Sequence, residues 1–544
     1  MKLGKKTGRT TAETIKNINI EKKAFFILLM LMAVYYGWRM FALTPWYDEL
    51  YTFYCFISKG PVYSAIHWPL PNNHVGYSVL SGFLNYLGNA YIGLRGISYL
   101  CALANLCLMY KIAERYFSDW QPLGIVVLYL SMGMVNQMAV QGRGYTLGIT
   151  CYLTAFLCMS KICEEERVSR WTYFIYIAAL VLGLYTVSSD VYWVVPLCLA
   201  GGTFLLYRSI RTAKEEGTTF LKTAAGKGLL RLILASVVAA VLTIGLYATI
   251  WLAIGSNLLV KDTESIYYGM GHVDMILKAP FDAIKRGMAY MLDTPYIQSE
   301  ERAGFVGRLV EWFRSLSGGI FGGLSIFIRI IWVAGCMYLL WQIIQKFRKQ
   351  DEKGLLLNLF LVIGFVFIPV VLFIQCKRPY YRVFTYVGVL TALLLGVLLG
   401  KLINWLKKHV FKEKKQYAEI LIGCLVLILA VKYMGFTGYN EQYSMRESEV
   451  HDILDHVDIE QYDSYCVTDC YQEYLLHFLY GIRCENCQIE GSQVVILDKR
   501  MTDPEFSEMV WEFYHYYNTI PWDYIEEKLQ VSYENEEYVL YTVK

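Results

Sequence analysis

The sequence lacks the short motifs by which many enzymes hold nucleotides or activate nucleophiles. It contains no P-loop, no Rossmann glycine run, no His-Glu-x-x-His and no Gly-x-Ser-x-Gly nucleophile elbow. Chemistry driven directly by ATP or a dinucleotide is therefore not indicated. We expect any group transfer by this chain to draw its energy from an activated substrate.

Charged residues are also scarce. Asp, Glu, Lys and Arg make up 18% of the 544 residues, whereas hydrophobic residues make up 56% and the mean hydropathy is +0.35. Such a chain is too apolar for a soluble protein of several domains, and apolar runs of about 17–25 residues are long enough to cross a bilayer core. We predict an all-α polytopic membrane protein with eleven spans, near residues 24–43, 94–116, 123–141, 144–162, 171–187, 192–208, 230–255, 319–344, 354–375, 382–404 and 418–436.

The distribution of Lys and Arg predicts how the chain crosses the membrane. The first apolar stretch follows a basic segment and has no small-residue cleavage site after it, which is typical of an uncleaved signal anchor. With the N-terminus in the cytoplasm, the inner segments hold 28 Lys and Arg, whereas the short outer loops hold few. We therefore predict a multi-pass plasma-membrane protein with a cytoplasmic N-terminus and an external C-terminus.

The last part of the chain has a different composition. Residues 437–544 carry a net charge of −17, whereas residues 1–436 carry +20. Strand-like runs at 464–468, 493–497 and 538–543 alternate with helix-like runs at 447–456, 471–480 and 504–517. We predict two domains, a membrane domain over 1–436 and a small acidic α/β domain over 437–544, which is expected to stand off anionic headgroups outside the membrane.

The cysteines divide in the same way. Ten of the 14 lie in or beside predicted spans, where cysteine behaves as a small apolar residue. The other four, in the acidic tail, are Cys466, Cys470, Cys484 and Cys487. In the cytosol their spacing would indicate zinc, whereas outside the membrane a pair of disulfides is favoured and the connectivity stays open.

The candidate chemistry begins where the first span ends. Asp48 and Glu49 follow that span directly, among aromatic residues that include Trp46 and Tyr47. A charged pair in this place is often only the solvated end of a helix. Arg143, however, returns a positive charge to the same predicted face at the turn between the third and fourth spans. An acid in one outer loop and a base in another is typical of a site for an anionic lipid substrate.

Arg143 and His74 are candidate ligands of the phosphate group of such a substrate. Arg143 lies between Gly142 and Gly144, so the backbone leaves room for its guanidinium to bind a phosphate through two hydrogen bonds. The alternative is an anchor that reaches from the span to the headgroups. His74 opens an amphipathic segment, where it either binds a ligand or phosphate or is an ordinary hydrogen-bonded histidine.

That amphipathic segment is too short to cross a membrane. Apolar residues fall on one helical face, namely Val75, Val79, Leu80, Phe83, Leu84 and Leu87, and polar ones on the other, namely Ser78, Ser81, Asn85 and Asn89. We expect a helix in the outer interface. It either forms one wall of a cleft open to lipid or has no such role.

Two more outer loops contain candidate residues. The loop 257–317 is long, and long loops tend to be functional, so we expect it to contain short helices. The loop 375–382 gathers Lys377, Arg378 and Arg382 beside two tyrosines, a composition suited either to a phosphate or to an interfacial anchor belt.

Taken together, these features resemble a known family. An Asp-Glu pair after the first span, an amphipathic segment opened by Asn-Asn-His, and Arg-Gly-Tyr at the third-to-fourth outer turn are similar to polyprenyl-phosphate-dependent glycosyltransferases of GT-C fold. The nearest groups are the protein O-mannosyltransferases, the aminoarabinose transferases that modify lipid A, and the bacterial RgtA/B/C/D-like group. The resemblance covers roughly residues 20–436.

The resemblance implies roles for individual residues. Asp48 would be the general base on the acceptor hydroxyl, and Glu49 would position the acceptor or hold the base. Arg143, with Tyr145 in the same turn, would contact the lipid phosphate. Relatives often have His-Pro-Pro where this chain has Asn-His-Val-Gly, which leaves the role of His74 less defined.

The chemistry is consistent with this resemblance. A sugar on a lipid phosphate needs a base for the incoming hydroxyl and cations for the departing phosphate. Asp48 would supply the base, and Arg143, His74 or the cations of loop 375–382 the charge. A single displacement would invert the anomeric centre. The acceptor is expected to be a hydroxyl on a lipid, glycan or protein, with no role for nucleic acid.

Some questions stay open at the level of sequence. Some members of the family use a divalent metal. In this chain Asp48, Glu49 and His74 would be its ligands, but two carboxylates are too few to indicate a metal site, so no cofactor is predicted with certainty. A transporter for lipid-linked sugars would need charged or broken helices at the midplane, and Arg329 is the one charge well inside a span. A non-catalytic scaffold or sensor working through the acidic tail is the other alternative.

Overall fold

The computed structural model describes residues 11–67, 73–255, 266–293, 297–412, 414, 416–433, 441–483, 488–502 and 520–544. The chain forms two compact units. The membrane unit comprises Met1–Phe41 and Lys59–Phe436, and the C-terminal unit comprises Ala42–Ser58 and Thr437–Lys544. The short segment after the first span thus belongs with the last 108 residues, an arrangement that the predicted domains at 1–436 and 437–544 did not include.

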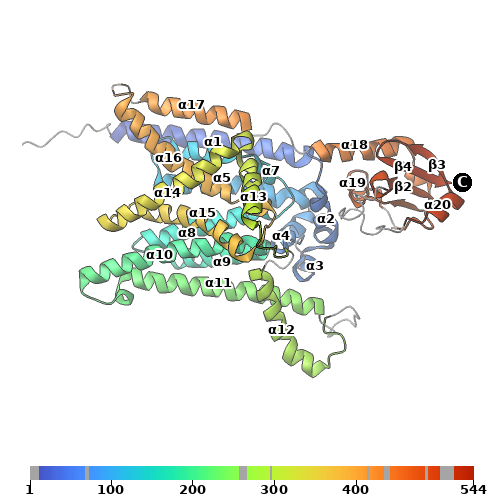
Figure 1. Cartoon of the computed structure of the whole chain (residues 1–544), viewed down its shortest axis with the longest axis horizontal. Coiled ribbons are helices and arrows are strands. Elements are labelled where there is room, and N and C mark those ends of the chain that lie inside the picture. Colours follow the sequence, from blue (N-terminus) through green and yellow to red (C-terminus); the bar gives the residue numbers. More distant parts are fainter. Residues whose placement is uncertain are drawn as a thin grey trace, which may run out of the picture. The chain divides into compact units, whose positions relative to one another are not determined.

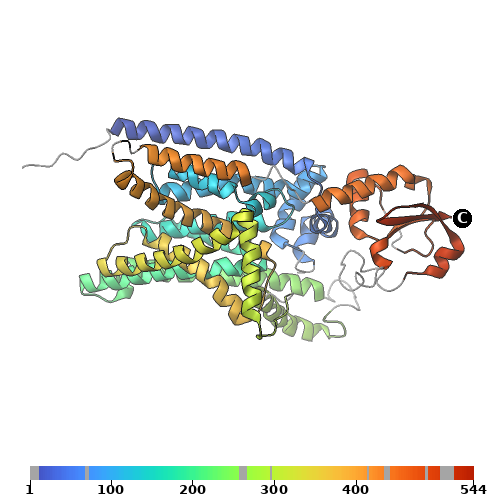
Figure 2. The same cartoon turned by 45° about the horizontal axis from the view of Figure 1, so that its top comes forward.

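The membrane unit is helical, and most of its long helices run alongside one another (Figures 1 and 2). Its α-helices are α1 (Thr11–Ala42), α3 (Pro61–Ile66), α4 (Val75–Asn85), α5 (Ala90–Tyr116), α6 (Gln121–Leu130), α7 (Gly133–Met138), α8 (Tyr145–Glu164), α9 (Arg170–Thr186), α10 (Val191–Glu216), α11 (Ala224–Gly255), α12 (His272–Asp293), α13 (Phe305–Phe321), α14 (Ser325–Lys349), α15 (Leu355–Gln375), α16 (Val387–His409) and α17 (Gln416–Tyr433).

Within the described residues, nine segments are long and apolar enough to cross a membrane. The prediction of a polytopic, mainly helical membrane protein is confirmed, and nine segments of the described residues, rather than the eleven predicted, meet this criterion. The predicted span 123–141 is broken into α6 and α7, of which the longer has 10 residues and a length of roughly 15 Å. The predicted span 171–187 corresponds to α9, which has 17 residues and is not among the nine segments.

Helix α8 is the central helix among these segments. In its most apolar part 78% of the residues are buried, compared with 28% in α1. A helix surrounded on all sides by other helices has few rotational alternatives, so its first residues are held in a fixed position. The candidate Arg143 immediately precedes α8 and therefore lies at the end of the most enclosed helix of this unit.

Helix α4 confirms the expected amphipathic segment but orients it in an unexpected way. Ser78 and Ser81 are buried, whereas the apolar Phe83 and Leu87 are exposed. The small residues allow close packing: a Cβ added at Gly82 would lie 2.9 Å from the backbone nitrogen of Pro61. The apolar residues of α4 are divided: Val75 is buried, whereas Phe83 is exposed, as expected for a helix that contacts lipid near its C-terminal end.

The region 257–317 holds more regular structure than the predicted short helices. It contains α12, which is 22 residues long, and most of α13. The predicted span 319–344 is part of a longer apolar segment, Phe305–Lys349, in which Gly322 separates α13 from α14.

The C-terminal unit is a small α/β structure, as predicted. Its elements are α2 (Tyr47–Cys55), α18 (Glu441–His456), β1 (Tyr465–Val467), α19 (Cys470–Tyr480), β2 (Val494–Asp498), α20 (Trp522–Lys528), β3 (Leu529–Glu534) and β4 (Tyr538–Val543). The sheet order is β1-β2-β4-β3. Strands β1 and β2 are parallel and joined through α19, and β4 pairs antiparallel with both β2 and β3.

Three of these strands and two helices match the predicted runs, which confirms the α/β prediction for this part. Strand β3 was not predicted, although its sequence, Leu-Gln-Val-Ser-Tyr-Glu, alternates apolar and polar residues; most of its side chains are exposed. The predicted helix at 504–517 lies outside the described residues.

Candidate functional site

The turn that carries Arg143 is fixed by hydrogen bonds to its backbone. The hydroxyl of Ser98, on α5, donates to the carbonyls of Gln141 and Arg143, the latter at 3.3 Å. The turn also packs closely on α5, since a Cβ added at Gly142 would lie 3.0 Å from the carbonyl oxygen of Leu94. Glycine is therefore required at position 142 by this close approach.

His74 is brought to the same turn by the start of α4. Its ring is buried, and its Nδ1 accepts a hydrogen bond of 2.8 Å from the backbone N–H of Gly144. Its Nε2 lies 3.3 Å from Nη2 of Arg143. A side chain at position 144 would collide with this ring, because an added Cβ would lie 3.0 Å from Nδ1 of His74 and 2.5 Å from Cγ2 of Thr186.

These contacts assign the proton of the imidazole. A neutral histidine has one donor and one acceptor nitrogen, and a guanidinium has only donors. Because Nδ1 of His74 accepts from Gly144, the proton of the neutral ring is on Nε2. Nε2 and the guanidinium of Arg143 are then two neighbouring donors, an arrangement that an anionic oxygen can satisfy by accepting from both.

Tyr145 and Arg382 complete this group. Nε of Arg382 donates to the hydroxyl of Tyr145 at 3.2 Å. The ring of Tyr145 meets that of His74 edge-on, with centroids 4.9 Å apart. Four of the predicted phosphate-binding residues, from three distant parts of the sequence, are thus brought together. We call His74, Arg143, Tyr145 and Arg382 the cationic cluster.

The electrostatics of the cluster keep His74 neutral. Burial lowers the pKa of His74 well below its usual value of 6.5, and the positive charges of Arg143 and Arg382 lower it further. An imidazolium in this position would have to lose its solvation beside two guanidinium groups. The cluster therefore holds two full positive charges and one neutral N–H donor.

The other two predicted cations are placed differently. Arg378 forms an ion pair with Glu300, which also binds Arg308 at 2.7 Å. Burial raises the pKa of Glu300, but the bonds from Arg378 and Arg308 outweigh this effect and lower it overall. Lys377 is buried, and its backbone N–H donates to the backbone carbonyl of Leu372 near the end of α15. Arg378 thus helps to fix its own loop, and a role of Lys377 and Arg378 with phosphate stays a prediction.

Asp48 and Glu49 lie in the C-terminal unit, in the first turn of α2. The carboxylate of Glu49 accepts a hydrogen bond of 2.9 Å from the backbone N–H of Trp46, and Glu49 is fully buried. It therefore caps the start of α2, an interaction typical of the third position of a helix. The exposed fraction of Asp48 is 9%, and its backbone carbonyl accepts a hydrogen bond of 2.7 Å from the hydroxyl of Thr52.

The structure also reveals polar groups that the sequence analysis did not name as site residues. The side-chain amide of Gln141, the hydroxyl of Thr186 and Oδ2 of Asp190 are buried and make no hydrogen bond within the described part of the chain. Thr186 contacts the turn at Gly144, and Asp190 packs one helical turn further along α8, against Gly148. The signal for Asp190 was a polar break in the apolar run 171–208, at a predicted outer turn.

The sequence analysis also named possible metal ligands and four cysteines that could form disulfides. Among the described residues, no three His, Cys, Asp or Glu side chains gather as a metal-binding group. Cys466 lies on β1 and Cys470 at the start of α19, both buried, whereas Cys484 and Cys487 lie outside the described residues. Disulfides among these four remain a prediction.

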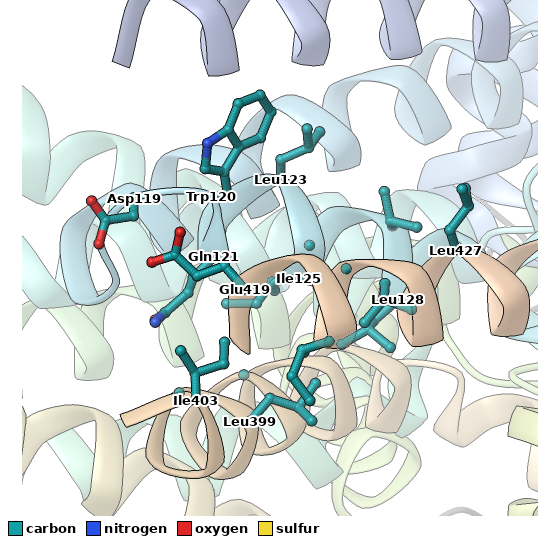
Figure 3. A pocket seen from close by; sticks show the side chains of 17 residues that line it. Asp119, Trp120, Gln121, Leu123, Ile125, Leu128, Leu399, Ile403, Glu419 and Leu427 are labelled. Atoms are coloured by element: carbon teal, nitrogen blue, oxygen red, sulfur yellow. The ribbon is translucent and has the colours of Figure 1, made fainter. Parts of the chain in front are cut away.

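A separate cavity of about 280 Å³ lies between α6, α16 and α17 (Figure 3). Its lining is mostly apolar, with Leu128, Leu399 and Ile403 among the side chains. Polar groups at its rim come from Asp119 and Glu419. None of the predicted site residues lines it, so the cationic cluster is not part of this cavity.

Comparison with known proteins gives the following. Neither a protein-family profile nor a curated protein sequence matches this chain. Among solved structures, it is similar to the oligosaccharyltransferase of Archaeoglobus fulgidus tethered to an acceptor peptide containing the NVT sequon, with 13% identity, a TM-score of 0.47, and coverage of 94% of this chain and 72% of that one. A second similar structure is the oligosaccharyltransferase AglB from Archaeoglobus fulgidus in complex with an inhibitory peptide and a dolichol-phosphate, with 12% identity, a TM-score of 0.45, and coverage of 90% and 71%.

Proposed function

We propose that this protein is an inverting membrane glycosyltransferase of the GT-C class that moves a sugar from a polyprenyl phosphate to a hydroxyl acceptor. The reaction takes place at the outer face of the membrane, with the N-terminus in the cytoplasm. The proposal rests on the sequence resemblance of residues 20–436 and on the cationic cluster, in which all residues except the half-buried Arg382 are buried. Asp48 is the general base, and the cluster binds the donor phosphate.

The observation that carries the proposal is the contact between His74 and Arg143. Two donors that lie 3.3 Å apart, both buried, favour an oxygen anion between or beside them. The cluster also lies at the N-terminus of α8, whose dipole favours negative charge at that end. Both features suit a phosphate better than a neutral ligand.

The chemistry follows from these groups. The oxygen of the acceptor hydroxyl bonds to the anomeric carbon, while the bond from that carbon to the phosphate oxygen breaks. Asp48 takes the hydroxyl proton, and the phosphate leaves with the electron pair of the broken bond. Arg143, Arg382 and the Nε2–H of His74 stabilise the negative charge that grows on the phosphate.

Arginine and a neutral histidine have different tasks in this scheme. A guanidinium stays charged at any working pH and can pair with two phosphate oxygens. The histidine offers a directed hydrogen bond, and it must keep its Nδ1 unprotonated to accept from Gly144. The proposal assigns no step to a metal ion.

The first experiment tests the transfer itself. Purified protein in lipid nanodiscs is incubated with radiolabelled polyprenyl-phosphate sugars and with candidate lipid, glycan and peptide acceptors. We expect sugar transfer by the natural protein, loss of transfer in Asp48→Asn, and inversion of the anomeric centre in the product. Near-normal transfer by Asp48→Asn at equal protein amounts would refute Asp48 as the base.

Donor binding is measured separately. Asp48→Asn should keep its affinity for the polyprenyl phosphate, whereas Arg143→Ala should bind it more weakly. Arg329→Ala is the matched control, because Arg329 lies on α14 and bonds only weakly, at 3.4 Å, to a carbonyl of its own helix. If the natural protein binds the donor but transfers nothing to any acceptor, and instead moves it across the membrane, a transporter is the correct function.

A further inference from the structure

The helix that carries Asp48 is part of the hydrophobic core of the C-terminal unit. Leu50, on α2, is fully buried. It packs with residues of α18, α19 and the sheet, namely Val450, Ile453, Leu475, Leu476, Val494 and Leu540. Residues separated by some 400 positions in the sequence therefore form one core, and α2 cannot shift without disturbing it.

Aromatic rings join α2 to α19 along their length. Tyr54 stacks on His477 with centroids 4.4 Å apart, and on Tyr474 at 5.3 Å. Tyr47 stacks on the same Tyr474 at 6.0 Å. Phe53 meets Phe478 edge-on at 5.5 Å. Contacts at Tyr47, Phe53 and Tyr54 fix both the rotation of α2 and its position along its axis, because they occur at both of its ends.

Polar contacts fix the backbone just before Asp48. The hydroxyl of Tyr471, on α19, donates a hydrogen bond of 2.8 Å to the carbonyl of Pro45, and the bond is buried. The hydroxyl of Thr44 donates to the carboxylate of Glu447, on α18. The segment before α2 is thus bonded to α18 and to α19, in addition to the cap that Glu49 provides at the start of α2.

From these contacts we infer that the C-terminal unit is a positioning element for the general base, and that Tyr471 is a positioning residue for Asp48. The inference rests on the proposed function, since it assumes that Asp48 is the base. It gives the acidic tail a task in the reaction that neither its charge nor its small size suggests. Tyr471 acts through the backbone at Pro45 and touches no reacting atom.

The physical reason is the precision that proton transfer demands. A catalytic group misplaced by about 1 Å can lose on the order of a hundredfold in rate, although the fold is intact. A single buried hydrogen bond to the turn before α2 is the kind of contact that sets such a position. Its loss should change the rate of the chemical step more than the binding of the donor.

The test uses the full-length protein and a conservative change. Tyr471→Phe removes the hydroxyl that bonds Pro45 and keeps the ring. Tyr524→Phe is the matched control, because its hydroxyl also donates to a backbone carbonyl, that of Ser492 at 3.4 Å. Tyr524 packs against a different hydrophobic cluster of the same unit, formed by Cys466, Ile489, Val495, Leu497, Ile525 and Leu529. We expect Tyr471→Phe to lower kcat about tenfold with the KM for donor unchanged, and Tyr524→Phe to leave both unchanged.

A second readout is independent of activity. Hydrogen–deuterium exchange of residues 47–55 should speed up in Tyr471→Phe and stay at the natural rate in Tyr524→Phe. The inference is overturned if Tyr471→Phe keeps the natural kcat and exchange, or if both variants lose activity equally. Failure of the proposed function looks different: there, Asp48→Asn is as active as the natural protein, whereas the exchange of residues 47–55 still responds to Tyr471→Phe.

Discussion

Nε2 of His74 lies 3.3 Å from Nη2 of Arg143, and both side chains are almost completely buried. The two residues are 69 positions apart in the sequence, and the turn of Gly144 joins them by donating its N–H to the other nitrogen of the imidazole. This contact places a neutral donor beside a permanent cation. The function of the cluster should therefore depend on His74, on Arg143 and on Gly144, whose backbone N–H holds the imidazole ring.

Arg143→Ala should weaken the transfer reaction. Loss of a charge-assisted hydrogen bond in a partly desolvated site costs on the order of 1.5–3 kcal/mol, or about ten- to a hundredfold. If the charge on phosphate grows as the sugar leaves, much of the loss appears in kcat. Arg143→Lys should recover only part of the rate, because Lys offers a single point charge. Unchanged kcat and donor KM in Arg143→Ala would make Arg143 a membrane anchor.

His74→Gln should change how stability depends on pH. The folded state lowers the pKa of His74, so the unfolded state binds the proton more readily. The stability that this neutral ring contributes is complete above the unfolded pKa of about 6.5 and is lost as the pH falls through the folded pKa. Thermal unfolding between about pH 5 and pH 8 should therefore show a smaller loss on acidification in His74→Gln than in the natural protein. Parallel curves would contradict a neutral, buried His74.

Gly144→Ala should damage the cluster through steric conflict alone. The added methyl group would lie 2.5 Å from Cγ2 of Thr186 and 3.0 Å from Nδ1 of His74. Overpacking of this kind costs about 1–3 kcal/mol, and we expect transfer to fall with it. Gly202→Ala is the control, since Gly202 lies inside α10 with no atom within 4 Å of the added carbon. That change should be neutral or should stabilise by up to about 1 kcal/mol.

Glu473 predicts a pH effect in the C-terminal unit. Burial raises the pKa of this carboxyl group, on α19, to about 7. The folded pKa of Glu473 lies above its unfolded pKa. The contribution of Glu473 to the free energy of unfolding is therefore complete below about pH 4.5 and is lost as the pH rises through about 7. Glu473→Gln should remove this loss and raise the unfolding temperature at neutral pH. If the variant unfolds with the same pH dependence as the natural protein, Glu473 titrates as an ordinary exposed acid.

The four tail cysteines give the last prediction. Cys466, Cys470, Cys484 and Cys487 should be oxidised in a domain that faces the outside of the cell. Mass spectrometry of unreduced, alkylated protein would then find none of these thiols modified. Four alkylated thiols, or bound zinc, would contradict the predicted side of the membrane.

Much of the architecture could be predicted because it is encoded locally. Apolar runs of sufficient length gave most of the spans, and short runs of apolar, β-branched and aromatic residues gave three of the four strands. The failures have local causes as well. The run 123–141 is mostly apolar, and the break between α6 and α7 falls at Ser131 and Gly133, two residues that are too common within spans to have indicated it. Strand β3 alternates apolar and polar residues but is mostly exposed, and its pairing with β4 was not recognised from that pattern.

The candidate site could be predicted only in part. The positions of Asp48, Arg143 and Arg382 beside spans were visible in the sequence, because charged groups at span ends stand out against an apolar background, and His74 was visible as the residue that opens the amphipathic segment. Their partners were not visible. Arg378 and Arg382 are four residues apart, yet one pairs with Glu300 and the other bonds Tyr145.

Hydropathy and charge act over a few residues at a time, so local patterns are enough to indicate a membrane protein with an acidic α/β tail and with an acid directly after its first span. The tertiary structure alone decided that residues 42–58 share a core with residues 437–544, and that His74 lies against Arg143. Both depend on contacts between segments far apart in the chain. Such contacts are set by the packing of whole helices, and no local pattern records them.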